Sequence, residues 1–198
     1  SYNIPAVKAL EKLGIAKGKQ ILHEAGIDSI QEEDDHYGLS LALGSAEVSL
    51  YQLTNAYRTL ANQGTYSDLQ SILSVTIDDQ TTTWPESPTR SQPTWLAPST
   101  LITHILQDNK ARLAEFGENN ALEFTYPVAA KTGTSRNFND NWTVGFTPHV
   151  TVGVWVGNSD GEPMKQVGGI TGAGPIFHQV MDTINNHQSA AFKQFSSL

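Results

Sequence analysis

The sequence contains no cysteine, so disulfide bonds and cysteine-ligated metal centres are excluded. The absence of cysteine does not indicate whether the protein lies in an oxidising or a reducing compartment. It also lacks any run of about 20 apolar residues, the length that a membrane-spanning helix needs. Charged residues make up only 16% of the chain, and the formal net charge is −8. Because an acidic chain without a basic stripe binds phosphate backbones poorly, we do not expect nucleic acid as a partner.

Several catalytic motifs are missing as well. The six histidines form no H-E-x-x-H pattern, since His23-Glu24 has no second histidine at the required offset. There is no G-x-S-x-G elbow for a serine hydrolase of the α/β type. The remaining helical candidates, His104 and His178, are interpreted as packed or solvated. We therefore expect neither a metal nor any other cofactor.

The chain is long enough to form a core. With 198 residues, of which 38% are hydrophobic, it can bury roughly 70% of its unfolded surface. It opens on Ser1-Tyr2-Asn3, without a methionine or a leader, and passes directly into a helix-like segment. We expect residue 1 to be a cut or truncation point.

Helical periodicity is clearest after Ser49, which can cap a helix together with Gln52 in a capping box. The helices predicted in this way span residues 4–13, 18–25, 49–62, 98–107, 111–116 and 174–186. Apolar β-type runs predict strands at 71–78, 127–134, 141–147 and 150–156, and four prolines predict a loop at 85–98. The last three strands read as an antiparallel meander, so the fold class is α+β, with helices flanking an antiparallel sheet.

The most informative tetrapeptide is Lys131-Thr132-Gly133-Thr134, at the end of an apolar strand. A lysine there can point into a cleft, and the absent side chain of Gly133 lets a substrate backbone approach the strand edge. The hydroxyls of Thr132 and Thr134 can donate hydrogen bonds to a carboxylate. On its own the motif also fits an ordinary strand end with a solvated lysine.

A second candidate is Ser1-Tyr2-Asn3, just before the first helix. A serine beside an ammonium group can relay a proton, and an asparagine can bind a substrate amide through both its donor and acceptor sides. The alternative is a serine that only caps the helix. Ser135-Arg136-Asn137 has the same spacing, but it lies in the loop after the strand and is rejected.

The two motifs match the second and third members of the set S-x-x-K, S-D-N and K-T-G, which marks penicillin-binding proteins and β-lactamases. Residues 1–13 (SYNIPAVKALEKL), 37–64 and 129–163 resemble the transpeptidase domain of class A, bifunctional penicillin-binding proteins. The segment VGVWVGNSDGEP and the later segment GITGAGPIF are most similar to the type 1C branch.

The chain departs from this family in one respect, because no serine is followed by lysine three residues later. The resemblance therefore implies that residues 1–198 are the C-terminal part of one transpeptidase domain. It implies a partial penicillin-binding-protein or serine β-lactamase-like fold, with the nucleophile upstream of Ser1. A glycosyltransferase domain and a membrane anchor would lie further upstream in the parent protein.

The resemblance implies acyl transfer on D-Ala-D-Ala stem peptides during cell-wall cross-linking. Ser1 and Lys131 would be catalytic, and Asn3, Thr132, Gly133 and Thr134 would bind substrate. The partners would be peptidoglycan stem peptides, β-lactams and the missing N-terminal half of the domain, from the same parent or a second chain. The location would be extracytoplasmic, at the periplasmic face of the bacterial cytoplasmic membrane, and this polypeptide alone would be inactive.

Two alternatives stay open. The chain could be a non-catalytic module that binds stem peptides or penicillin, or it could belong to a D,D-carboxypeptidase or β-lactamase-like hydrolase, in which water is the acceptor. The truncation also predicts an apolar sheet face or strand edge without its cover. We therefore expect this piece to co-purify with the missing segment or to aggregate.

Overall fold

The computed structural model describes residues 2–165 and 167–195, with side chains described as far as residue 187. The helices are α1 (Asn3–Leu13), α2 (Ile15–Glu24), α3 (Asp34–Tyr37), η1 (Gly38–Leu43), α4 (Leu50–Ala61), η2 (Pro93–Trp95), α5 (Leu96–Gln107), α6 (Asn109–Phe116), η3 (Arg136–Phe138) and α7 (Ala173–Phe195). The strands are β1 (Thr65–Ser67), β2 (Ser74–Ile77), β3 (Gln80–Thr83), β4 (Thr89–Ser91), β5 (Ala129–Thr134), β6 (Asp140–Phe146) and β7 (Thr151–Gly157).

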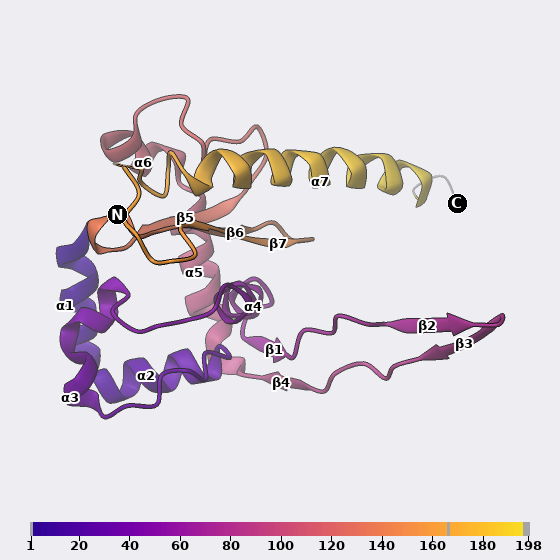
Figure 1. Cartoon of the computed structure of the whole chain (residues 1–198), viewed down its shortest axis with the longest axis horizontal. Coiled ribbons are helices and arrows are strands. Elements are labelled where there is room, and N and C mark those ends of the chain that lie inside the picture. Colours follow the sequence, from indigo (N-terminus) through magenta and orange to yellow (C-terminus); the bar gives the residue numbers. More distant parts are fainter. Residues whose placement is uncertain (1, 166, 196–198) are drawn as a thin grey trace.

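The central sheet is an antiparallel meander in the order β5-β6-β7, which confirms the predicted α+β class. Helix α4 packs against one face of this sheet and α7 against the other (Figure 1). In the register, Lys131 is opposite Val144 and Gly133 is opposite Trp142. Since paired residues share a face and neighbours alternate, these four side-chain positions all lie on the α4 face.

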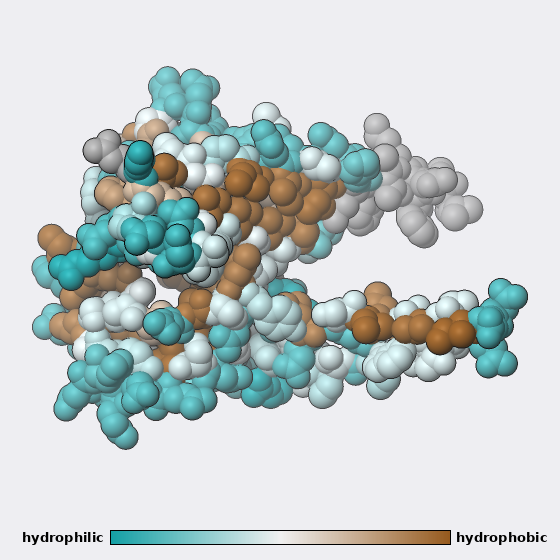
Figure 2. Space-filling view, in the orientation of Figure 1, coloured by the Kyte–Doolittle hydropathy of each residue, from teal (hydrophilic) through white to brown (hydrophobic). Residues whose placement is uncertain are grey.

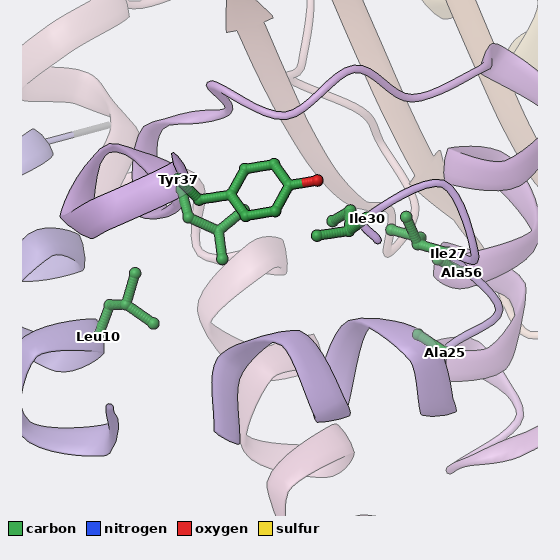
Figure 3. Packing of buried hydrophobic residues seen from close by; sticks show 7 residues of the cluster. Leu10, Ala25, Ile27, Ile30, Tyr37 and Ala56 are labelled. Atoms are coloured by element: carbon green, nitrogen blue, oxygen red, sulfur yellow. The ribbon is translucent and has the colours of Figure 1, made fainter. Parts of the chain in front are cut away.

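Among the described residues, buried apolar side chains form two clusters. The first joins α1, α2, α4 and the segment between them around Leu10, Ile30 and Tyr37 (Figure 3). The second lies under α7, where Phe177 and Met181 are buried against Leu122 and the sheet. The groove described below lies between α4 and the sheet, so both of its walls rest on a packed core.

Helix α4 begins as the sequence predicts. The Ser49 hydroxyl accepts a hydrogen bond from the N–H of Gln52 at 3.1 Å, which satisfies one of the unpaired donors of the first turn. The Ser49 hydroxyl in turn lies 3.4 Å from Oε1 of Gln52. The cap fixes the entry of the chain into the helix that forms part of one wall of the groove.

A two-stranded arm, residues 72–84, projects from the molecule, and its apolar side chains form the brown stripe in Figure 2. Asp78 and Asp79 have positive φ angles of 49° and 63° and form the two-residue turn that links β2 to β3. Leu73, Val75 and Ile77 alternate with polar residues, and Leu73 and Ile77 are 69% and 67% exposed. The arm thus has one apolar face that nothing covers within the described residues.

Several boundaries differ from the sequence-based expectation. Helix α2 starts at Ile15 and runs through Gly18. A Cβ at Gly18 would lie 2.6 Å from Cδ1 of Leu10, so the glycine permits close packing of α2 against α1. The proline-rich stretch 85–98 is not simply a loop: it contains β4, which pairs with β1. The predicted strand at 71–78 becomes half of the arm.

In the part of the chain that the structure describes, no helix has both the length and the apolarity of a membrane span.

Candidate functional site

A groove of about 550 Å³ separates the sheet from α4 and the segment that precedes it. One wall is formed by β5, β6 and their connection, and the other by residues 43–48 and α4. The described residues that line it are Leu43, Gly44, Ser45, Ala46, Glu47, Val48, Leu53, Tyr57, Lys131, Thr132, Gly133, Thr134, Ser135, Asp140, Trp142 and Val144. All four residues of the predicted K-T-G-T stretch therefore border one cavity.

Lys131 stands half-buried on the groove side of β5. Its Nζ donates to the carbonyl of Thr132 at 2.6 Å. Burial lowers the pKa of the Lys131 ammonium, and the nearby Arg112 guanidinium lowers it further, while Glu115 acts in the opposite direction. The protonated form of Lys131 is thus less favoured in this environment than in water.

The threonines of the motif lie on the other face of β5. Thr134 accepts a hydrogen bond at Oγ1 from the N–H of Gly169, at 2.9 Å, and Thr132 lies beside the same glycine. A Cβ at Gly169 would meet the carbonyl oxygens of Gly133 and Trp142 at 2.5 and 2.8 Å. The chain therefore needs glycine here to bring its N–H to Thr134.

Strand β5 is an edge strand of the described sheet. In an antiparallel strand, the N–H and C=O of one residue point to the same side, and successive residues alternate. The carbonyl of Ala130 accepts from Arg112 and that of Thr132 from Lys131, so both point away from β6. By alternation, the N–H and C=O of Thr134 point to that side as well.

Trp142 lines the groove opposite Gly133. Trp142 is only half-buried and Trp155 is 37% exposed, so neither is a core residue. A Cβ at Gly133 would lie 3.3 Å from Cβ of Trp142, so a side chain there would narrow the groove. The indole N–H of Trp155 donates to Oδ1 of Asp140 at 2.9 Å, which fixes the start of β6.

The S-x-N candidates are placed differently. Ser1 lies outside the described residues. Asn3 is the first residue of α1, its side chain is exposed, and it is not among the described residues that line the groove. Ser135, from the rejected second match, accepts at Oγ from the N–H of Asp140 at 2.8 Å and so closes the loop after β5.

Sequence reasoning did not single out Tyr57, Gly169 or Arg112. Tyr57 belongs to the apolar stripe of α4, and burial raises the pKa of its hydroxyl to about 12. Gly169 falls in the glycine-rich run 168–174, whose spacing is the one signal that could have indicated close backbone packing. Arg112 lies on the short helix α6, where nothing in the sequence pattern distinguishes it from a solvated arginine.

The described histidines are not grouped with other metal-ligating side chains. His178 stacks on Phe124 and its Nδ1 lies 3.0 Å from the carbonyl of Ala121, so it is a packed residue, as expected. Within residues 2–165 and 167–195, no group of three or more His, Cys, Asp or Glu side chains is arranged to hold a metal ion.

The family model of the penicillin-binding protein transpeptidase domain matches residues 1–182. Penicillin-binding protein 1C of Escherichia coli (strain K12) is 29% identical over 181 residues, which cover 91% of this chain and 21% of the relative. Penicillin-binding protein 1A of Aquifex aeolicus (strain VF5) is 31% identical over 195 residues, covering 93% and 24%. The chain thus spans about a fifth to a quarter of the length of these curated relatives.

Solved structures show the same fold. Penicillin-binding protein 3 from Mycobacterium tuberculosis, complexed with aztreonam, aligns with a TM-score of 0.70 at 17% identity, covering 94% of this chain and 49% of that one. Penicillin-binding protein 1A from Haemophilus influenzae aligns with a TM-score of 0.69 at 17% identity, covering 92% and 32%. With its K-T-G-T edge strand beside a groove, the chain belongs to the penicillin-binding protein transpeptidase family.

Proposed function

We propose that this chain forms part of the active site of a serine D,D-transpeptidase that cross-links peptidoglycan through D-Ala-D-Ala stem peptides. The observation that carries the proposal is the edge strand β5, whose K-T-G-T residues border one groove of about 550 Å³. Family membership supports the reaction class. The class A parent and its type 1C branch belong to the proposal as well, and so does a site at the extracytoplasmic face of the membrane.

The strand edge suits an acyl transfer. The N–H of Thr134 points away from β6, into the space where a peptide aligned on β5 would lie. A backbone N–H in that position can stabilise the negative oxygen of a tetrahedral intermediate, and losing such a donor costs about 100- to 1000-fold in rate. We assign Thr134 N–H as one donor of the oxyanion hole, and the nucleophile would supply the other.

The threonine hydroxyls suit a terminal carboxylate. Because Thr134 Oγ1 accepts from Gly169, its own O–H is available as a donor to a ligand on the outer side. Thr132 lies on the same face of the strand, two residues earlier. Together they would hold the carboxylate of a D-alanine or of a β-lactam, while Gly133 leaves room for the substrate backbone.

Lys131 and Ser1 would assist a proton transfer, and Asn3 of the same S-x-N segment would bind substrate. In the proposed reaction Lys131 lies near Ser1, and its positive charge favours the transfer of a proton through Ser1 to the leaving nitrogen. Asn3 would hold the substrate amide. Residues 1–198 contain no S-x-x-K, so we propose that the nucleophilic serine and its lysine base come from a segment outside this sequence, which would also cover the groove.

Fluorescent penicillin tests both parts of the proposal. The 198-residue chain alone is expected to take up no covalent label, whereas a longer protein that adds the S-x-x-K segment is expected to be labelled stoichiometrically. Labelling of the short chain would show that its nucleophile lies within residues 1–198. If the longer protein binds penicillin without a covalent bond, the chain is a binding module rather than part of an enzyme.

A further inference from the structure

Arg112 is a half-buried guanidinium on α6 to which the proposed reaction assigns no part. Its Nη1 donates to Oδ1 of Asn109 at 2.6 Å and to the carbonyl of Leu122 at 3.2 Å. Its Nη2 donates to the carbonyl of Leu106 and, at 3.3 Å, to that of Ala130. One side chain thus joins the end of α5, the segment before β5 and β5 itself.

The chemistry of these contacts calls for arginine. The carbonyl of Leu106 lies in the last turn of α5, where helical carbonyls have no partner within their own helix. A guanidinium offers five N–H donors in a rigid planar fork, so it can serve several carbonyls that diverge from one point. A lysine ammonium at the same place keeps the charge but has no such fork.

Ala130 is the residue before Lys131, and its carbonyl points away from β6. Resting on the proposed function, we propose that Arg112 is a positioning residue: it clamps the edge of β5 at Ala130 and thereby sets the place and the electrostatic surroundings of Lys131 in the groove. The clamp also closes the strand edge at Ala130. A bound peptide is then left with the N–H of Thr132, whose carbonyl accepts from Lys131, and with the edge at Thr134.

The charge of Arg112 adds to this geometric role. Burial and the Arg112 guanidinium both lower the pKa of Lys131, in that order, and Glu115 raises it. The other titratable groups that line the groove are Glu47, Tyr57 and Asp140. The guanidinium disfavours a second positive charge nearby, so removing it raises the pKa of Lys131. The part of a pH–rate profile that reflects ionisation of this lysine then shifts to higher pH.

The test compares three variants of the longer protein that supplies the nucleophile. Arg112→Gln removes the fork and the charge, Arg112→Lys keeps the charge without the fork, and Lys110→Gln removes an exposed charge from the same helix. Two quantities are followed between pH 6 and 11: the rate constant for acylation by benzylpenicillin, and the reactivity of Lys131 toward trace acetic anhydride, read by mass spectrometry.

Arg112→Gln is expected to slow acylation roughly 10- to 100-fold, since a displaced strand misaligns the reacting groups. It should also shift the titration of Lys131 to higher pH. Arg112→Lys is expected to slow acylation while leaving the titration of Lys131 unshifted, and Lys110→Gln should leave both unchanged. A folded Arg112→Gln protein with the wild-type rate and titration overturns the inference.

Two further outcomes also test the inference that Arg112 positions Lys131. If Arg112→Gln does not fold, a wild-type rate in Arg112→Lys rules out the fork as the clamp. If the unaltered protein is not acylated at all, the proposed function fails, and the inference is then judged on Lys131 alone. Its titration by acetic anhydride needs no turnover, and an equal shift in Arg112→Gln and Lys110→Gln would overturn it.

Discussion

Gly169 donates its backbone N–H to the hydroxyl oxygen of Thr134 across 2.9 Å, although 35 residues separate the two in the chain. The contact occupies one acceptor site of the hydroxyl and so orients its proton. It also ties the glycine-rich segment before α7 to the end of β5.

Gly169→Ala is expected to slow acylation of the longer protein by benzylpenicillin by roughly tenfold or more, because the segment must move away from the carbonyls of Gly133 and Trp142. Gly168→Ala is the matched control, since its new Cβ would meet only Thr134 Oγ1, at an ordinary 3.7 Å. Acylation rates and melting temperatures of both variants are the measurements. Equal rates in the two variants would contradict this account of Gly169.

Thr134→Val should weaken the binding of ligands that carry a carboxylate by roughly 10- to 100-fold, as expected for loss of a hydrogen bond to a charged group. Thr134→Ser keeps the hydroxyl and should stay close to wild type. The affinity of the longer protein for a β-lactam and for its methyl ester, measured in parallel, separates carboxylate binding from other effects. An equal loss for acid and ester would argue against a carboxylate at Thr134.

Tyr57 should make the free energy of unfolding depend on pH in the alkaline range. Its pKa is about 12 in the folded chain and 10.0 in a model peptide, so its contribution is complete below pH 10.0 and is lost as the pH rises through about 12. The loss amounts to something on the order of 2 kcal/mol. Denaturant unfolding at pH 8 and pH 11.5 should show a smaller decrease for Tyr57→Phe than for wild type. Parallel decreases in the two proteins would exclude Tyr57 as the source.

The arm should tolerate polar residues on its apolar face. Leu73→Thr with Ile77→Thr is expected to change the free energy of unfolding by no more than about 0.5 kcal/mol, because both side chains are exposed. Self-association, measured by light scattering, should decrease, since exposed apolar strands promote aggregation. Thr76→Ser, on the opposite face, is the control. A loss above about 1.5 kcal/mol would mean that the face is packed in solution.

The fold was predictable where the sequence carries its own local signal. Ser49 and the apolar stripe behind it predict α4, and the three apolar runs after residue 127 predict the meander. Strand β3 was missed because its residues, Gln80 to Thr83, are all polar, and it depends on the Asp78-Asp79 turn that pairs it with β2. Strand β4 was hidden among prolines that flank it without interrupting it.

The site was only partly predictable, for a different reason. The K-T-G-T stretch was recognised as a unit, but residue spacing says nothing about which other elements meet it. The contact of Gly169 with Thr134 and the clamp of Arg112 on Ala130 both join segments that are distant in sequence. The roles proposed for Ser1 and Asn3 stay predictions, to be tested in the longer protein.

The hydrogen bond from Arg112 to Ala130 has a consequence for selectivity. It would leave a peptide aligned on β5 only a short ladder, two residues long at most, so main-chain pairing would read little more than a dipeptide. Under the proposed function, discrimination among stem peptides that differ further from their carboxyl end would rest on surfaces beyond this strand.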